Sequence, residues 1–212
     1  MFDKVIETKN KKISIQINNM GEVILKKPKN YNGKLLQEFV ESKKDWIIEH
    51  KTKILTEIEK NSSIINYTEI FILGEKKELI LNATENKIEG NKVYAKTNRS
   101  LITLLKKETL NFMKSRLVEL KKRVGVEPRG FDVENTKRRW GVCSSKHIIK
   151  INLRAIMVSK ECFDYILIHE LSHIKEFNHS KKFWNIVKKN CPKYTLYKKE
   201  LKQKAFLLDL YR

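Results

Sequence analysis

The sequence predicts an α+β fold with a small β-rich amino-terminal lobe, followed by a lobe with a short β-sheet and a metal-binding helix. Short β-prone segments fill much of residues 1–97, whereas residues 98–212 contain longer segments with apolar residues at helical spacing. One of these helical segments carries the His-Glu-x-x-His pattern of residues 169–173. The chain has 212 residues, of which 41% are hydrophobic, so it is long and apolar enough to bury a substantial core.

In the amino-terminal lobe we expect a hairpin formed by strands at residues 13–17 and 23–25, because apolar residues alternate or cluster around a Gly-containing turn. Apolar residues at helical spacing then predict one helix over residues 34–58. Further short strands are expected at residues 69–73, 78–82, 87–89 and 92–95. Repeats and proline-rich linkers are absent from the sequence, so no linker marks the expected boundary between the lobes near residue 97.

The second lobe is expected to open with a helix over residues 100–123, which ends at Gly125. Residues 144–146 are suited to a turn that pairs the strands on either side. The expected strands cover residues 130–135, 137–143 and 147–152.

The His-Glu-x-x-His pattern has the spacing of a catalytic metal site. Residues four apart on an α-helix lie one above the other, about 6 Å along the axis, so His169 and His173 can bind one ion. Glu170 lies about 100° further round the helix, where it can reach a metal-bound water and act as a general base.

His179 supplies a third imidazole only if the helix ends first. A continuous helix would carry His179 to nearly the opposite side, so we expect a break between residues 174 and 178. Ser180 is suited to cap a new helix that stops at residues 190–192. Three imidazoles leave a fourth position for water, whereas structural zinc sites are usually closed by four ligands, so catalysis is favoured.

Several segments on both sides of this motif resemble the YgjP-like metallopeptidases, a family of zincins. The resemblance rests on residues 139–146, 151–154, 164–165 and 179–184, together with residues 39–47 and 71–74 nearer the amino terminus. It implies a zincin-like second lobe in which His169, His173 and His179 hold one zinc ion per chain and Glu170 is the base. Val142 departs from the small residue common in the family, and Glu176 stands where metzincins have glycine.

The resemblance also implies that the hairpin over residues 140–151 forms an edge strand that takes an extended peptide. His147 at its turn is expected to be exposed, because a fourth ligand would close the water position. Cys143 is expected to be a small buried residue near the site. If His179 did not bind the metal, Glu200 would be the next candidate ligand.

Other polar residues are candidates for supporting roles that their spacing does not distinguish. The candidates for stabilising an oxyanion are Tyr165, Tyr194, Tyr197 and Arg154, although Tyr165 is better suited to the core. The candidates for hydrogen bonds to the imidazoles are Asn152, Arg154 and Asp164.

The formal net charge of +20 has two interpretations. It comes from 37 lysines against 8 arginines, with 17 asparagines, a pattern that favours a solvated surface over a nucleic-acid interface. The alternative is an acidic partner, such as DNA docked on the amino-terminal lobe through Lys26, Lys27 and Lys29.

A zinc metallopeptidase acting on protein or peptide substrates is therefore the predicted function. The alternatives are a zinc-dependent hydrolase of nucleotide phosphoanhydrides and a DNA-associated, SprT-like protease or binding module. A glycine-rich phosphate loop and a known DNA-binding motif are both missing from the sequence, which counts against them.

Cysteine usage and hydropathy predict a cytoplasmic protein without a membrane partner. The three cysteines include no Cys-x-x-Cys pair, which argues against a disulfide framework and a thiolate zinc site. The sequence has no apolar run of the roughly 18 residues that span a bilayer, and its first residues lack the apolar stretch of a signal peptide.

Overall fold

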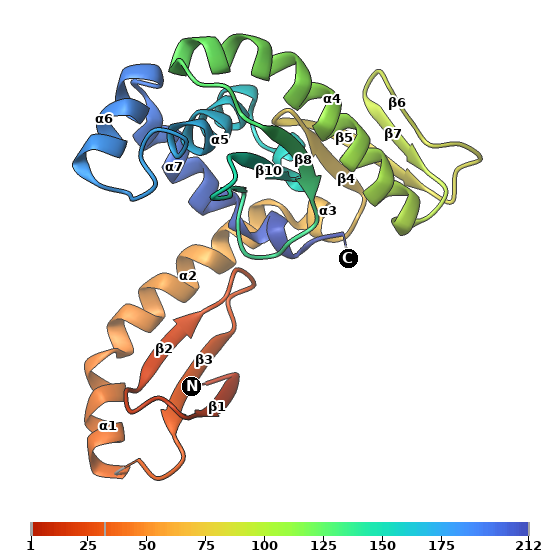
Figure 1. The fold of residues 1–212 in the computed structure, drawn as a ribbon. Coiled ribbons are helices and arrows are strands. Elements are labelled where there is room, and N and C mark those ends of the chain that lie inside the picture. Colours follow the sequence, from red (N-terminus) through yellow and green to blue (C-terminus); the bar gives the residue numbers. More distant parts are fainter. Residues whose placement is uncertain (1, 32, 212) are drawn as a thin grey trace. The chain divides into compact units, whose positions relative to one another are not determined.

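The computed structural model describes residues 2–31 and 33–211, and the chain has an α+β fold (Figure 1). Contacts divide it into two compact units, residues 1–62 and residues 63–212. Each unit has its own sheet and helices, so each is described by itself.

The first unit is a three-stranded sheet with two helices. Its sheet has the order β1-β3-β2, with β1 parallel and β2 antiparallel to β3. The strands are β1 (Lys4–Thr8), β2 (Ser14–Ile17) and β3 (Val23–Pro28). The hairpin expected over residues 13–25 is confirmed. Strand β1 was not expected, because it is largely exposed and pairs with a strand distant in sequence.

The helix expected over residues 34–58 is interrupted. The structure has α1 (Gly33–Ser42) and α2 (Lys44–Lys60), with Lys43 between them. The hydroxyl of Ser42 donates to the carbonyl of Phe39 at 2.7 Å, a local bond that competes with helix continuation. Apolar spacing alone does not report such a break.

The second unit contains two sheets. One has the order β4-β5-β7-β6 and the other has the order β8-β10-β9, so β9 lies at an edge. The first sheet comprises β4 (Glu69–Ile72), β5 (Glu75–Leu81), β6 (Lys87–Glu89) and β7 (Lys92–Ala95). The second comprises β8 (Gly130–Glu134), β9 (Gly141–Cys143) and β10 (Ile148–Asn152). The expected strands are thus present, and β9 is shorter than the predicted residues 137–143.

Helix α4 (Asn98–Val124) links the two sheets of this unit, since it contacts β7 of one and β8 of the other (Figure 1). It begins at a capping box formed by Thr97 and Ser100 and ends at Gly125, whose φ of 74° permits the left-handed turn. The other helices are α3 (Ser62–Ile65), α5 (Lys160–Ser172), α6 (Lys181–Asn190) and α7 (Tyr194–Gln203), with 3₁₀ turns η1 (Leu153–Met157) and η2 (Lys204–Asp209).

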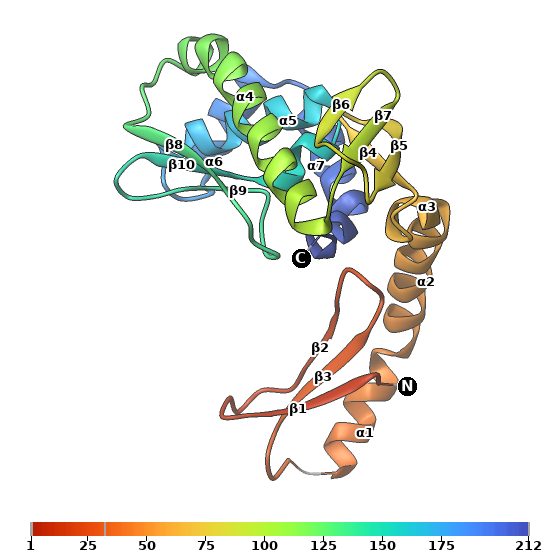
Figure 2. The ribbon, with the colours of Figure 1, turned by 90° about the vertical axis from the view of Figure 1, so that its right-hand side faces the viewer.

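Helix α5 is central to the second unit. It contacts α4, α6 and α7 as well as β9 and β10, and Figure 2 shows it beside α4 and α7. Because so many elements cover α5, most of its residues are buried.

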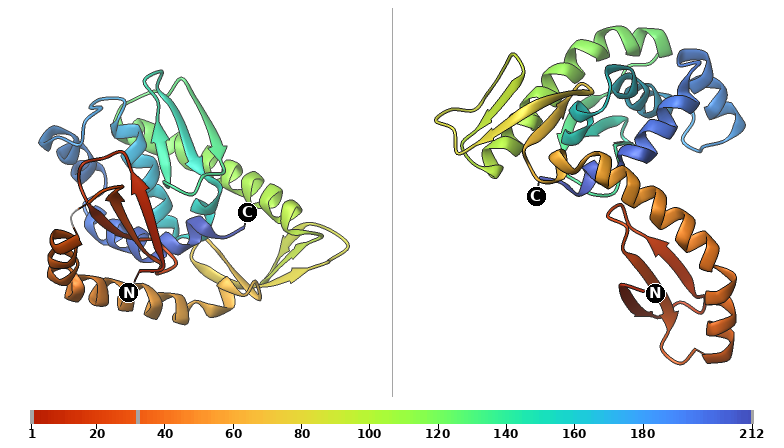
Figure 3. Two further views of the ribbon diagram at one scale, coloured as in Figure 1. Left: turned by 90° about the horizontal axis from the view of Figure 1, so that it is seen from below. Right: turned by 180° about the vertical axis from the view of Figure 1, so that it is seen from behind.

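Contacts divide the chain at residue 62. The sheet of β4–β7 belongs with the second unit because α4 contacts β7 and the amide of Leu73 donates to the carbonyl of Ile156. Figure 3 shows these strands beside α4 in two further views. That residues 1–97 and 98–212 form separate folding domains stays a prediction. Among the described helices, none combines the length and the apolar character that crossing a bilayer requires.

Candidate metal centre

The candidate centre is built on the carboxyl-terminal half of α5. Ser159 caps the start of this helix, since its hydroxyl accepts from the amide of Cys162 and donates to the carboxylate of Glu200. The apolar residues that follow are buried on nearly every face of the helix, and His169 and Glu170 lie in its last turn. A helix held in this way offers a rigid platform for a donor and a base.

The break after α5 is confirmed and comes slightly earlier than residues 174–178. The helix ends at Ser172, whose hydroxyl donates to the carbonyl of Ile168 at 2.7 Å, and His173 is the C-cap. The predicted cap at Ser180 is also confirmed, because its hydroxyl accepts from the amide of Phe183 as α6 begins.

The turn brings the three histidines together. Their ligand atoms all lie within 4.8 Å of one another, and Nε2 of His179 is 3.1 Å from Nε2 of His169. Nδ1 of His173 lies 3.2 Å from the carbonyl oxygen of Glu176, which can only accept, so Nδ1 carries the proton and Nε2 is free to bind a metal.

Aromatic side chains of α6 hold two of the imidazoles in place. The ring of Phe183 stacks on His173 with centroids 4.4 Å apart, and Trp184 stacks on His179 with centroids 5.7 Å apart. Helix α6 therefore orients the donors that the loop brings to the centre.

His169 and His173 are held in the neutral form that binds metals. Burial, with smaller contributions from His173, His179 and Lys198, lowers the pKa of His169 to about 3. Burial also lowers the pKa of His173. Three imidazoles at this separation fit a divalent ion such as zinc.

Glu170 is buried beside the donors, with 6% of its surface exposed, and lies against strand β9. The amide of Cys143 hydrogen-bonds to it, and a Cβ on Gly141 would come within 2.8 Å of its Oε1. Glycine at position 141 is therefore required for the carboxylate to lie there. Burial raises the pKa of Glu170 to about 8, although Arg139 and the Cys143 amide act in the opposite direction.

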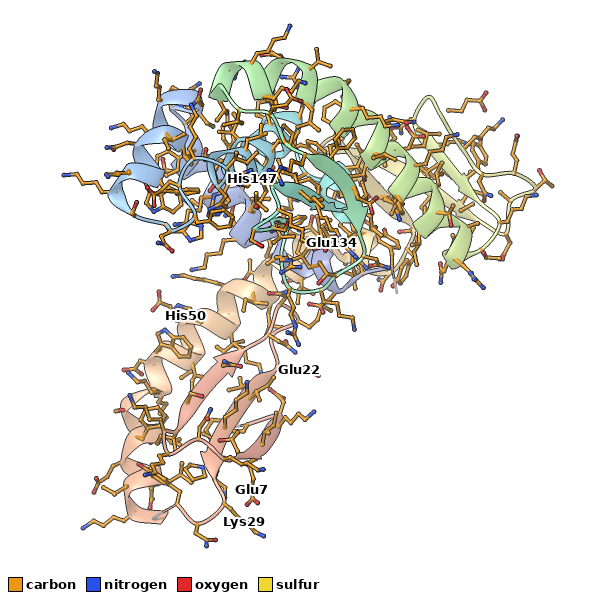
Figure 4. The ribbon with its side chains drawn as sticks, in the orientation of Figure 1. Glu7, Glu22, Lys29, His50, Glu134 and His147 are labelled. Carbon is orange, nitrogen blue, oxygen red and sulfur yellow. The ribbon has the colours of Figure 1, made fainter. Side chains whose placement is uncertain are left out.

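An open pocket of about 310 Å³ covers the donors and Glu170. It is lined by Gly141, Val142, Cys143, His169, Glu170, His173, Phe177 and His179. The sequence did not suggest Phe177, which is 48% exposed and whose ring centroid lies 6.2 Å from that of His147. His147 lies at the β9–β10 turn with a φ of 57° (Figure 4), and it is not among the clustered donors of the described residues.

The residues expected to hydrogen-bond to the imidazoles have other partners. Arg154 donates to the carbonyls of Leu210 and Tyr211, and Asp164 forms a bidentate ion pair with Arg116. Arg154 is 1% exposed, so it is not available as an oxyanion donor either.

Asn152 acts on the segment that precedes β9. Its amide nitrogen donates to the carbonyls of Thr136 and Arg139, and its backbone amide donates to the carbonyl of Trp140. Asn152 therefore fixes the approach to the edge strand rather than an imidazole.

Two of the tyrosine candidates lie near the centre. Tyr165 is buried with its ring centroid 6.0 Å from that of His169, and burial raises its pKa to about 12, in keeping with a core role. Tyr194 stacks on Trp184 with centroids 5.4 Å apart, whereas Tyr197 approaches Tyr165 at 6.3 Å.

Glu200 and Cys143 have local roles. The carboxylate of Glu200 accepts from Ser159 at the opposite end of α5 from the histidines, which excludes it as a replacement ligand. Cys143 is half-buried rather than fully buried, and burial followed by the charge of Glu170 raises its pKa to about 11, so the thiol stays protonated.

Comparisons with known proteins found one family model and one solved structure that are similar to this chain. The model of a family described as the YgjP-like metallopeptidase domain matches residues 11–204. The solved structure of the metallopeptidase zymogen of Pyrococcus abyssi abylysin is similar over 43% of this chain and 92% of that chain, with 25% sequence identity and a TM-score of 0.41. No curated protein matched the chain.

Proposed function

The chain belongs to the YgjP-like metallopeptidase family, and we propose that it hydrolyses peptide bonds with one zinc ion held by His169, His173 and His179. The observation that carries the proposal is the convergence of three imidazole donors beside a buried carboxylate in one pocket. Three nitrogen donors leave a coordination position for water, as catalytic rather than structural zinc sites do.

When bound, zinc acidifies a water molecule and polarises the scissile carbonyl group. In its ionised form, Glu170 takes the proton of the attacking water and passes it to the leaving amine. Its buried position keeps the carboxylate away from bulk water, and the Cys143 amide holds it on the side of the pocket that faces β9. His173 is kept in the required tautomer by the Glu176 carbonyl.

Strand β9 supplies the surface on which a peptide can lie. Among the described strands it pairs with β10 alone, so its other edge presents main-chain donors and acceptors beside the pocket. An extended peptide can add to this edge through main-chain hydrogen bonds, which implies broad sequence preference.

The test compares wild type with Glu170→Gln on an unfolded protein substrate, with zinc content measured for both. The variant should keep its zinc and its fold and lose turnover by at least about 10²-fold, because the proton acceptor is gone. Near-normal hydrolysis by the variant would contradict the assigned base. Hydrolysis of nucleoside triphosphates without peptide hydrolysis by wild type would contradict the assigned substrate.

A further inference from the structure

Helices α6 and α7 carry a concentrated set of exposed lysines, which we call the α6–α7 lysine surface. It comprises Lys181, Lys182, Lys188, Lys189, Lys193, Lys198, Lys199 and Lys202. Within residues 180–203 the one acidic residue is Glu200, which accepts hydrogen bonds from Ser159. The surface is therefore strongly positive.

The general abundance of lysine does not account for this surface, as α2 shows. Helix α2 has four lysines and four acidic residues, and Lys44, Lys51 and Lys53 each form an ion pair. In the described residues, by contrast, the α6–α7 lysine surface makes no ion pair with an acidic side chain. Compositional bias produces lysines interspersed with acidic residues, as in α2. It does not account for eight lysines beside a single carboxylate.

The two units of the chain also differ in net charge. Residues 1–62 carry 13 basic and nine acidic residues, whereas residues 63–212 carry 32 basic and 16 acidic residues. Lys27, one of the lysines considered for DNA docking, pairs with Glu7 at 3.2 Å. The excess positive charge is thus concentrated in the unit that contains the metal centre.

The α6–α7 lysine surface adjoins this centre through a chain of stacked groups. Nζ of Lys198 lies 4.7 Å from the centroid of the Trp184 ring, and that ring stacks on His179. Helices α6 and α7 both pack on α5, which carries Glu170 (Figure 3). Lys198 therefore connects the α6–α7 lysine surface to the metal centre.

We propose that the α6–α7 lysine surface binds an acidic segment of the polypeptide substrate next to the scissile bond. This inference rests on the proposed peptidase function. Lysine ammonium groups are compact charges that attract carboxylates in varied positions, and residues 180–203 contain no arginine fork of the kind that phosphates favour. A ten-residue helix is about 15 Å long, enough to face an extended peptide of about five residues.

The first test measures binding separately from hydrolysis. Fluorescence anisotropy measures the binding of a labelled peptide to the zinc-loaded protein. The peptide has about twelve residues, with glutamates flanking an uncharged centre. The test variant changes Lys181, Lys188, Lys199 and Lys202 to Gln. The matched control changes Lys106, Lys107, Lys114 and Lys122 of α4 to Gln, which are also exposed and outside any ion pair with a described acidic residue.

Both variants remove four charges, so a general charge effect weakens binding equally in both. We expect the α6–α7 variant alone to bind the acidic peptide about tenfold more weakly at about 50 mM salt, with the difference fading at about 1 M salt as screening increases. Equal weakening in the two variants overturns the inference. So does selective loss of oligonucleotide binding with unchanged peptide binding, which would assign the surface to nucleic acid.

The second test compares hydrolysis of two peptides that share a scissile core and differ in acidic or uncharged flanks. The α6–α7 variant should raise KM for the acidic peptide by about tenfold and leave kcat and the uncharged peptide unchanged. An equal change for both peptides overturns the inference. If wild type hydrolyses neither peptide, the proposed peptidase function fails, and selective binding in the first test still supports the acidic ligand.

Discussion

The two halves of the metal centre are held in different ways. His169 and Glu170 lie on α5, whose residues are mostly buried against α4, α6 and α7. His179 lies on an exposed segment after the end of α5 and is fixed by stacking on Trp184 and by the cap of α6. The core therefore orders His169 and Glu170 before any metal binds, whereas the position of His179 depends on local contacts and on a bound metal.

The largest expected effects come from His179→Ala and His169→Ala, which should differ in the stability of the metal-free protein. Both should lose most of their zinc and activity, because each removes one of three donors. Only His169→Ala should also destabilise the metal-free protein, by about 2 kcal/mol, because it leaves a cavity beside α5. Metal analysis and denaturation of the metal-free proteins test this. Equal destabilisation by both substitutions would show that the two halves are held alike.

Gly141→Ala tests how tightly the buried half is packed. The new methyl group would lie within 3.0 Å of Glu170 and Ile151, so the carboxylate must move. A shift of about 1 Å should lower turnover by about 10²-fold while zinc content is unchanged.

The matched control is Gly130→Ala on β8, where an added Cβ would meet atoms no closer than 3.9 Å. It should behave as wild type in turnover and zinc content. Full activity in Gly141→Ala would show that Glu170 does not need its present position.

Removal of the metal should affect the two halves unequally. Chelation should speed hydrogen exchange over residues 174–180 by about tenfold or more, because zinc ties His179 to α5, while amides within α5 stay protected. Hydrogen exchange with mass spectrometry measures both segments in one sample. Unchanged exchange over residues 174–180 would contradict a role for zinc in ordering the loop.

The smallest effects concern the two capping serines. Ser159→Ala should lower the free energy of unfolding by about 1 kcal/mol, because it removes the cap of α5. Ser180→Ala should instead lower zinc affinity by about fivefold, since the cap of α6 holds the segment that carries His179. Denaturation and zinc titration distinguish the two, and a pure stability loss in Ser180→Ala would contradict the local role.

Which supporting residues could be predicted depends on where their partners lie in the chain. Tyr165 lies four residues before His169, and their rings are neighbours, as the helical spacing predicts. Asp164 lies one residue before Tyr165 and therefore points from a different side of α5, toward Arg116 of α4. Arg154 binds carbonyl groups at the other end of the chain, and no local pattern indicates such partners.

The sequence by itself determined the grouping of the three histidines with Glu170 and the break between α5 and α6, because helical spacing and capping act over a few residues. Only the tertiary structure decided that Gly141 of β9 covers Glu170 and that burial raises the pKa of this carboxyl group. It also placed Lys198 of the α6–α7 lysine surface beside His179 through Trp184. Burial and charge at the centre depend on packing between segments that are distant in the chain, and local sequence patterns do not predict that packing.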